Sequence, residues 1–336
     1  MILVTGATGF VGAHLLYFLL QRADKIRAIY RSEAKIEEVK EVFSYYEKNA
    51  NELLDRIHWI KADITEVPVM TDAFVGVEKV YHCAALVSFN PKDYHEMQKV
   101  NIEGTAIIAN LAIKAKVKKF CYVSSIAAVG NSIKNNEITE ENEWNKDSDH
   151  SDYAITKFGG EMEVWRASQE GIPVVIVNPG IILGSGFWNT GFGKFFSKIN
   201  TGIKYYTKGV TGFVGVEDVV TAMIKLMESP IRNERFILVS ENRSFKNVLF
   251  LIATVLQKKP PVTILKSWQT ELFWRFSKTA SFFTRKAPLL SKHTARSIHS
   301  VSKYSSEKIK KTIDFNFTTI DEVIKKVGKH FFKRTG

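Results

Sequence analysis

The fold is decided by the stretch Met1-Ile-Leu-Val-Thr-Gly-Ala-Thr-Gly-Phe-Val-Gly-Ala13. It starts with a short apolar run typical of a buried β-strand, and an apolar helical stretch follows from about Phe10 to Arg22. Glycines at positions 6, 9 and 12 join the two. Such a turn directs unpaired backbone N–H groups and the positive end of the helix dipole at one point, where a pyrophosphate fits well.

Each glycine of this turn has its own expected role. Gly6 allows the tight turn, Gly9 lets backbone approach a phosphate closely, and Gly12 lets the helix pack against the strand. The spacing is G-x-x-G-x-x-G rather than the G-x-G-x-x-G of the dinucleotide fingerprint, so a tight turn without a ligand is the alternative. The residues predicted to bind the phosphates are Gly6, Thr8, Gly9, Phe10, Val11 and Gly12.

The composition is that of a globular protein with an excess of basic residues. Hydrophobic residues make up 45% and charged residues 24% of the 336 residues, and the net charge is +12. The basic excess is concentrated after Lys246. No zinc-ligand spacing, arginine run or known nucleic-acid module accompanies it, so we expect a solvated face or an anionic ligand rather than nucleic acid.

Cys83 and Cys121 are the only cysteines, and both lie in apolar runs that predict buried structural thiols. We therefore expect no metal site. The first strand begins at residue 2 without a basic segment or cleavage site before it, so no signal peptide is expected. No apolar run approaches the roughly 20 residues that span a bilayer. These absences favour a cytoplasmic location by default.

Apolar strand-like runs alternate with helical stretches through the first half of the chain. After the first strand we predict strands at 26–30, 57–62, 79–85, 120–124 and 174–178, with helical stretches that include 33–54, 95–115 and 153–170. Apolar strands in this order indicate an α/β fold with a doubly wound parallel sheet, covered on both faces. Ligands of such sheets bind at the carboxyl ends of the strands.

Arg31 follows the second strand, where an acidic residue would bind the ribose hydroxyls of NAD. No acid is present from Ile29 to Ser32. An arginine there can pair with the 2′-phosphate of NADP and stack on adenine, with help from Lys35. The pattern therefore indicates NADP as the cofactor, with NAD as the alternative. A solvated surface arginine is the competing interpretation.

Two further strand ends carry candidate cofactor contacts. Asp63 and Ile64 follow the third strand, where the carboxylate can accept hydrogen bonds from adenine and the apolar side chain can lie against the ring. A helix N-cap is the alternative for Asp63. Ala84 and Ala85 follow the fourth strand, where small residues let a ribose lie against backbone; strand packing is the alternative.

The stretch Tyr153-Ala-Ile-Thr-Lys157 places a phenol and an ammonium on one face of a predicted helix. The positive charge lowers the pKa of the phenol, which can then act as acid or base on an alcohol or ketone. An exposed helix pair is the alternative. Ser124 and Ser125 end the fifth strand, and a serine hydroxyl there can hold the substrate oxygen beside the phenol.

The chain resembles the extended short-chain dehydrogenase/reductases, and within them the dihydroflavonol 4-reductase and 3β-hydroxysteroid dehydrogenase branch. The resemblance covers nearly the whole chain. Arg31 is similar to the arginine of the NADP-preferring reductases of that branch. The motifs that carry the resemblance are Thr5-Gly-Ala-Thr-Gly-Phe-Val-Gly12, Asp63, Ala84-Ala85, Asn101, Ser124-Ser125, Tyr153-x-x-x-Lys157 and Asn178-Pro-Gly180.

The resemblance implies a catalytic role for three residues. Tyr153 is the acid or base, Lys157 lowers its pKa and holds the nicotinamide ribose, and Ser125 is the catalytic serine because it lies five residues before Gly130. The resemblance also implies cofactor contacts or a place near the site for Ser124, Pro179, Gly180 and Asn101.

One departure separates the chain from the sugar-nucleotide epimerases of the same superfamily. These usually carry an Arg/Tyr-Gly-Pro pattern after the sixth strand. Here the stretch Pro179-Gly-Ile-Ile-Leu-Gly-Ser-Gly-Phe-Trp188 lacks the expected tyrosine and arginine. The departure weakens the case for a nucleotide-sugar substrate.

Residues 1–180 are expected to form an NAD(P)-binding Rossmann domain, with a return segment at about 210–240. Residues 181–209 and 241–336 are expected to form a smaller, mostly helical substrate-binding region. Within it, the glycine-rich stretch 185–193 indicates a mobile aromatic loop, and Asp218 in the return segment is expected to be structural.

The aromatic and basic stretch 267–290 has three interpretations: a helical lid over an apolar substrate, an interfacial helix on anionic lipid, or a helix packed on the core. It contains Trp268, Phe273, Trp274, Phe276, Phe282 and Phe283 with Arg275, Lys278, Arg285 and Lys286.

The leading functional hypothesis is an NADP-dependent oxidoreductase that transfers a hydride between NADPH and a ketone or secondary alcohol. The alternative enzyme is an NAD-dependent nucleotide-sugar epimerase or dehydratase. A third hypothesis, a redox-sensing regulator without turnover, conflicts with the presence of Tyr153 and Lys157. The expected partner is a small-molecule substrate, and both a monomer and a homodimer are compatible with the resemblance.

Overall fold

The computed structural model describes residues 1–23, 25–132, 137–284 and 290–335. Within them, the centre of the fold is a seven-stranded sheet whose neighbouring strands are all parallel. Its order is β10-β6-β5-β4-β1-β2-β3. The strands are β1 (Ile2–Thr5), β2 (Ile26–Tyr30), β3 (Ile57–Lys61), β4 (Lys79–His82), β5 (Lys119–Val123), β6 (Val174–Pro179) and β10 (Glu234–Leu238). The predicted doubly wound α/β sheet is confirmed.

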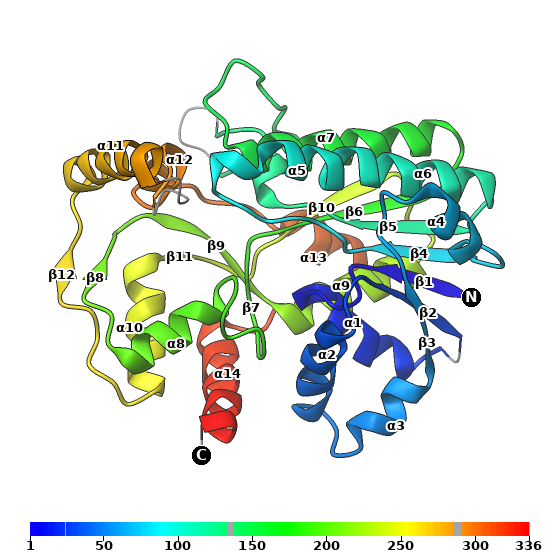
Figure 1. Cartoon of the computed structure of the whole chain (residues 1–336), viewed down its shortest axis with the longest axis horizontal. Helices are drawn as coiled ribbons and strands as arrows, with labels where there is room; N and C mark the ends of the chain where they lie inside the picture. The colour runs from blue at the N-terminus through cyan, green and yellow to red at the C-terminus, as the bar shows by residue number, and fades with distance from the viewer. Residues whose placement is uncertain (24, 133–136, 285–289, 336) are drawn as a thin grey trace.

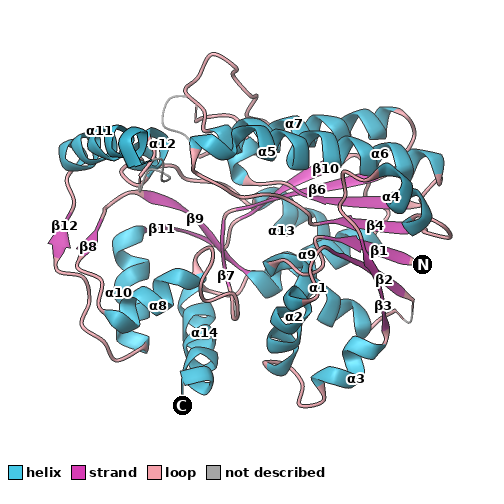
Figure 2. Ribbon diagram, in the orientation of Figure 1, coloured by secondary structure: helices cyan, strands magenta, loops and turns pink. Residues whose placement is uncertain are grey.

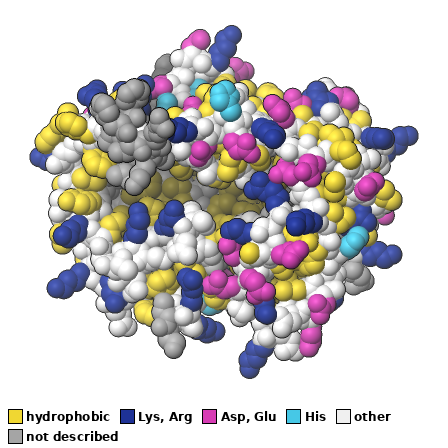
Figure 3. Space-filling model, in the orientation of Figure 1, with side chains coloured by type: hydrophobic (Ala, Val, Ile, Leu, Met, Phe, Trp, Pro, Cys, Tyr) yellow, Lys and Arg dark blue, Asp and Glu magenta, His cyan; other side chains and the backbone are white. Residues whose placement is uncertain are grey.

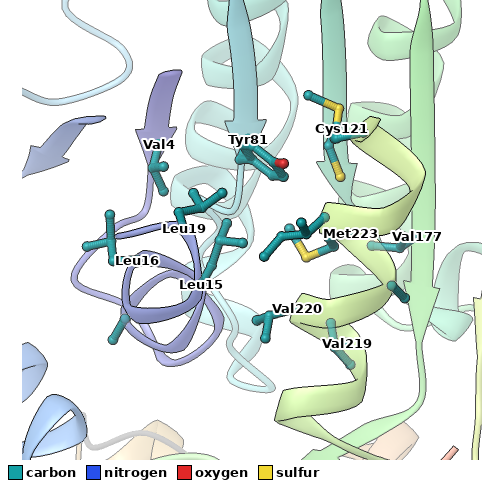
Figure 4. Packing of buried hydrophobic residues seen from close by; sticks show 14 of the residues in the cluster. Val4, Leu15, Leu16, Leu19, Tyr81, Cys121, Val177, Val219, Val220 and Met223 are labelled. Atoms are coloured by element: carbon teal, nitrogen blue, oxygen red, sulfur yellow. The ribbon is translucent and has the colours of Figure 1, made fainter. Parts of the chain in front are cut away.

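Helices cover both faces of the sheet (Figure 1). On one face lie α1 (Phe10–Leu20), α2 (Ala34–Ser44) and α9 (Val216–Glu228), and on the other α4 (Val67–Ala73), α5 (Tyr94–Gln98), α6 (Gly104–Lys114) and α7 (Asp152–Gln169). Apolar side chains of α1 and α9 meet the sheet in a continuous core (Figure 4). Burial of this apolar surface is the main stabilising contribution to the fold. Figure 4 labels Leu15, Leu16, Leu19, Val219, Val220 and Met223 from the helices and Val4, Tyr81, Cys121 and Val177 from the sheet.

Two predicted helices are interrupted. The charged stretch 33–54 forms α2 and a separate α3 (Ala50–Asp55). The chain leaves the helix near Tyr46, which stacks on Tyr17 of α1 with ring centroids 4.4 Å apart and hydrogen-bonds His14. The stretch 95–115 contains a wide π-helical turn at Lys99–Glu103 between α5 and α6. The fourth strand ends at His82, three residues earlier than predicted.

The second half of the chain builds a smaller region beside the carboxyl ends of the large sheet (Figures 1 and 2). It contains a three-stranded sheet, the strand pair β8–β12 and several helices. A third hydrophobic core joins α8, α10 and α14 to this sheet. These elements are β7 (Ile181–Leu183), β9 (Val210–Gly215), β11 (Glu241–Ser244), β8 (Tyr205–Tyr206), β12 (Thr263–Ile264), α8 (Gly193–Thr201), α10 (Phe245–Val255), α11 (Ser267–Thr284), α12 (Lys292–Ser297), α13 (Glu307–Ile313) and α14 (Ile320–Thr335).

The two cysteines are free thiols: Cys121 is buried in β5, and Cys83 lies just after β4. Burial raises the pKa of Cys83 to about 12. Among the described residues no cluster of His, Cys, Asp or Glu is placed to hold a metal ion. No helix in the described ranges combines the length and the apolar character needed to cross a bilayer.

Candidate active site at the carboxyl ends of the sheet

The glycine turn after β1 has little room for side chains. Gly6 has φ +64°, and a Cβ on it would lie 2.5 Å from the backbone nitrogen of Ala84, after β4. A Cβ on Gly12 would lie 2.2 Å from the carbonyl oxygen of Gly6. Gly9 is the N-cap of α1 and makes no side-chain cap, so the first N–H groups of the helix face the turn without a capping side chain. This cradle fits a phosphate.

Three other residues predicted to contact the cofactor, Phe10, Val11 and Ile64, pack against neighbouring side chains or helices. The ring of Phe10 packs edge-on against Phe187, with centroids 5.7 Å apart, and Val11 contacts the first hydrophobic core. Ile64 is buried, and its side chain lies against α6 at Gly104, where a Cβ would be 2.7 Å from Ile64 Cδ1. The contacts of Ile64 and Val11 with a cofactor stay predictions.

Arg31 and Asp63, from the ends of β2 and β3, lie together. The guanidinium Nη1 is 3.4 Å from Asp63 Oδ2, and 66% of the Arg31 side chain is exposed. Asp63 does not cap α4, whose N-cap is Glu66; its carboxylate accepts hydrogen bonds from Thr65 instead. Partial burial raises the pKa of Asp63, but the hydrogen bonds from Thr65 and the charge of Arg31 outweigh it and lower the pKa.

Lys35 does not join this pair. Its ammonium lies 2.6 Å from Glu38 within α2. Arg31 is therefore the cation that faces Asp63 at this strand end, and its contact with a cofactor stays a prediction.

Ser125 and Tyr153 lie together at the end of β5. The Ser125 hydroxyl lies close enough to Tyr153 to affect the pKa of its phenol, and the backbone carbonyl of Ser125 accepts a hydrogen bond from Asn178 at 3.0 Å. Ser151 caps α7 and fixes the helical turn that carries Tyr153. Burial raises the pKa of Tyr153, while the Ser125 hydroxyl opposes the rise. The phenol is therefore protonated at neutral pH.

Lys157 lies one turn further along α7 but is directed at β5. Its Nζ donates to the Tyr122 hydroxyl at 2.9 Å and to the carbonyl of Val123 at 2.8 Å. Burial lowers the pKa of Lys157 to about 7, and the carboxylate of Glu161 opposes the shift. The lowered phenol pKa expected from the Tyr153–Lys157 spacing is absent here, because both of these hydrogen bonds direct the ammonium to β5.

Glu161 continues the same face of α7 and was missed by sequence reasoning. It is fully buried and accepts hydrogen bonds from Ser124 at 2.7 Å and Asn178 at 2.9 Å, with Arg235 of β10 at 3.2 Å. The hydroxyl of Ser124 is thus engaged by this carboxylate, and the contact of Ser124 with a cofactor stays a prediction. The spacing of four residues from Lys157 was the available sequence signal.

A buried polar network supports the site from the opposite side of α7. Asn101, in the π-helical turn, bonds both backbone polar groups of Leu86 and the hydroxyl of Thr156. His82 bridges Thr5 of β1 and Thr105 of α6. Burial lowers the pKa of His82 to about 3, so the ring is neutral. The network ties the turn after β1 to the helix that carries Tyr153 and Lys157.

Pro179 and Gly180 end β6 against the small sheet. A Cβ on Gly180 would lie 2.5 Å from the carbonyl oxygen of Gly212, and the Gly180 N–H donates to the carbonyl of Leu238 at 3.0 Å.

Phe89 lies beside Tyr153 with ring centroids 6.0 Å apart and is 58% exposed. Figure 3, which draws the molecule in the orientation of Figure 1, shows a hollow near the middle of the face in view, with hydrophobic side chains at its floor.

The aromatic residues of the glycine-rich stretch 185–193 are buried or partly buried, while residues 189–191 are exposed, and the mobility expected of this loop stays a prediction. Trp188 is buried, and its ring N–H donates to Glu41 at 3.1 Å and to Tyr45 at 3.0 Å. Asp218 is structural as expected, since it accepts two hydrogen bonds from Thr318. A cavity of about 540 Å³ between α9 and α14 contains none of the predicted catalytic residues.

Comparison with known proteins identifies the family. The family model described as male sterility protein, an NAD-binding domain, matches residues 4–226. The chain is 28% identical to sterol demethylase protein B of Methylococcus capsulatus, over 93% of this chain and 92% of that protein. It is 26% identical to a putative dihydroflavonol 4-reductase of Synechocystis, over 79% and 75% of the two chains.

Solved structures share the fold over the whole chain. The structure of gox2253 has a TM-score of 0.82 at 24% identity and covers 99% of this chain and 98% of its own. The UDP-glucose 4-epimerase of Thermotoga maritima has a TM-score of 0.77 at 21% identity, with 100% and 99% covered. The chain therefore belongs to the NAD-binding male sterility family within the extended short-chain dehydrogenase/reductases and is an NAD(P)-dependent enzyme of that type.

Proposed function

We propose that the protein is an NADP-dependent oxidoreductase that transfers a hydride between NADPH and an apolar ketone or secondary alcohol. The observation that carries the proposal is the proximity of the Ser125 hydroxyl to the Tyr153 phenol at the carboxyl end of β5, with the buried ammonium of Lys157 one helical turn from Tyr153. A substrate carbonyl oxygen between the two hydroxyls would accept a hydrogen bond from each.

The residues around the cradle suit a dinucleotide. The pyrophosphate would be held by the turn of Gly6, Thr8, Gly9, Phe10, Val11 and Gly12, and the adenosine would lie near Asp63, Ile64, Ala84 and Ala85. Arg31 would pair with the 2′-phosphate. Near the nicotinamide we assign Ser124, Pro179 and Gly180, with Tyr153 and Lys157 beside its ribose. NADPH, when bound, supplies the hydride.

The protonation state of Tyr153 favours ketone reduction. Since burial raises its pKa, the phenol is protonated at neutral pH and can donate its proton to the oxygen on which negative charge develops. The Ser125 hydroxyl donates a hydrogen bond to the same oxygen and stabilises that charge. Oxidation of an alcohol requires the phenolate, so we expect it to be favoured at higher pH.

Two observations favour an apolar substrate. Phe89 and Val87 expose apolar surface on the segment that contacts Tyr153, and the hollow of Figure 3 has a hydrophobic floor. The relative named sterol demethylase protein B spans nearly the whole chain, which supports a polycyclic ketone as the first compound to test. Residues 181–209 and 241–336 would then supply the substrate side of the site, beside the Rossmann domain of residues 1–180.

The test is consumption of NADPH and NADH with a panel of polycyclic ketones and, separately, UDP-sugars. We expect ketone-dependent oxidation of NADPH, with Tyr153→Phe and Ser125→Ala each lowering kcat at least about a hundredfold. Tyr17→Phe, on α1 and outside both the site and the substrate-binding region, is the matched control. Arg31→Ala should raise the KM for NADPH and leave that for NADH unchanged, whereas Arg22→Ala should change neither.

Three outcomes contradict parts of the proposal. Interconversion of UDP-sugars without net NADPH consumption would establish the epimerase alternative, and full ketone reduction by Tyr153→Phe would remove the assigned acid. Equal use of NADH by the wild type would make Arg31 a surface residue.

A further inference from the structure

Among the side chains of helix α11 that the structure describes, polar ones are buried and large apolar ones are exposed. Thr270 and Ser281 are buried, and the Thr270 hydroxyl lies 2.9 Å from His299 Nε2. By contrast, 60% of Trp268, 51% of Phe273 and 72% of Phe276 are exposed, and Leu272 is exposed as well. A helix that packs on a core buries the opposite side. Of the three interpretations of this stretch, the core-packed helix therefore does not fit the exposed Trp268, Phe273 and Phe276. The side chains of Lys278, Phe282 and Phe283, and residues Arg285 and Lys286, lie outside what the structure describes.

The exposed apolar side chains of α11 share one side of the helix. Trp268, Leu272 and Phe276 recur every four residues, so they lie along one side of α11 with Phe273 beside them. The strand pair β8–β12, which directly precedes the helix in the chain at β12, exposes Tyr205 and Val262 as well. Backbone bonds from residues 262 and 263 to the carbonyl of Lys204 hold the pair together. We call these residues the docking face: Tyr205, Val262, Trp268, Leu272, Phe273 and Phe276.

Basic residues surround the docking face. Figure 3 shows hydrophobic and basic side chains close together at this end of the molecule. The exposed cations on these segments are Lys204, Lys258, Lys259, Lys266 and Arg275. Glu271, the acidic residue of α11, is already engaged by Arg275 and Arg296. The field around the apolar side chains is therefore positive.

We propose that the docking face binds the surface of an anionic phospholipid bilayer. Aromatic side chains are favoured at the boundary between headgroups and acyl chains, and lysine and arginine are attracted to the lipid phosphates. The same charges argue against a second copy of the chain, because a symmetric contact would bring the basic residues of both copies together. The face also runs onto the β8–β12 edge of the molecule (Figure 1), which a lid over the hollow would not require.

The test is sedimentation of the full chain with vesicles of phosphatidylcholine alone or mixed with phosphatidylglycerol. We expect binding to the mixed vesicles, weakened at least about tenfold by 0.5 M salt because charges are screened. A variant with Trp268→Ser, Phe273→Ser and Phe276→Ser should lose at least about tenfold in affinity, as should Lys259→Glu with Lys266→Glu. Val67→Ser with Val75→Ser, exposed valines around α4, is the matched control.

The proposal stands apart from the proposed reaction, since vesicle binding needs neither cofactor nor substrate. Failure of the wild type to bind mixed vesicles overturns it, as does equal binding by the triple serine variant with an unchanged circular dichroism spectrum. Dimerisation that the triple variant abolishes would assign the face to a second copy instead. If the wild type binds no vesicles and the triple serine variant has a raised KM for ketones, the docking face would be assigned to a substrate lid.

Discussion

Tyr153 and Lys157 lie on one face of α7, yet their side chains meet different partners. The phenol lies near the Ser125 hydroxyl, and the ammonium donates hydrogen bonds to Tyr122 and Val123. A lysine with a pKa of about 7 is charged only in part at neutral pH. Glu161 opposes this loss of charge from its buried position one turn away. The charge of Lys157 thus depends on the buried carboxylate of Glu161.

In Glu161→Gln we expect the pKa of Lys157 to fall by on the order of one unit, because the negative charge that favours the ammonium is removed. The high-pH limb of the kcat profile should therefore move to lower pH, with a loss of about tenfold at pH 7.5. Glu163→Gln, on the same helix but paired with Arg166, is the control. A profile that falls equally at every pH would make Glu161 a purely structural residue.

At the scale of elements, the turn between β1 and α1 depends on close backbone contacts. Gly6 combines a left-handed φ with backbone of Ala84 only 2.5 Å from its missing Cβ. Gly76, before β4, has φ +73° but nothing within 4 Å of that position. A side chain on Gly76 would therefore cause only backbone strain, whereas a side chain on Gly6 would cause the same strain and a steric clash as well.

We expect Gly76→Ala to lower the free energy of unfolding by about 1–2 kcal/mol, the cost of a left-handed alanine. Gly6→Ala should cost at least about 3 kcal/mol, since strain and overpacking add. Urea unfolding measures both, and calorimetry with NADP⁺ should show binding lost only in Gly6→Ala. Equal unfolding free energies for the two variants would contradict the contact with Ala84.

At the scale of the whole molecule, buried polar groups join segments far apart in the chain. His14 of α1 bonds Tyr46 and the carbonyl of Ser185, and Ser185 bonds His330 of α14. Burial lowers the pKa of His14 to about 4 and that of His82 to about 3. Both rings must stay neutral for the fold to keep these contacts.

Acid should therefore destabilise the protein from about pH 6.5 downward. The unfolded chain takes up protons near pH 6.5, but the folded chain resists them until pH 3–4. Each histidine contributes a slope of up to about 1.4 kcal/mol per pH unit across that window, with stability falling as pH falls. Urea unfolding of His82→Gln between pH 7 and 4.5 should show a shallower slope than the wild type, whereas the exposed His95→Gln should not. Parallel curves for wild type and His82→Gln would show that His82 titrates normally.

Local sequence patterns determined most of the secondary structure of the large sheet. Apolar runs and the glycine spacing predicted six strands of the large sheet, the turn after β1 and the helix of Tyr153 and Lys157 to within a few residues. They succeed because strand, turn and helix each have a short period that the residues themselves carry. The same patterns predicted that Arg31 and Asp63 lie at one edge of the sheet, because the carboxyl ends of parallel strands lie together.

Only the tertiary structure decided which side chains meet. Sequence spacing suggested that Lys157 faces Tyr153, but Tyr122 and Val123 of β5 take its hydrogen bonds. Arg235 reaches Glu161 across 74 positions because β10 returns to the edge of the large sheet. The aromatic residues at 187–192 and 268–276 have similar composition, yet Trp188 is buried and Phe276 is exposed. Burial depends on which distant segment covers a residue, and no local pattern contains that partner.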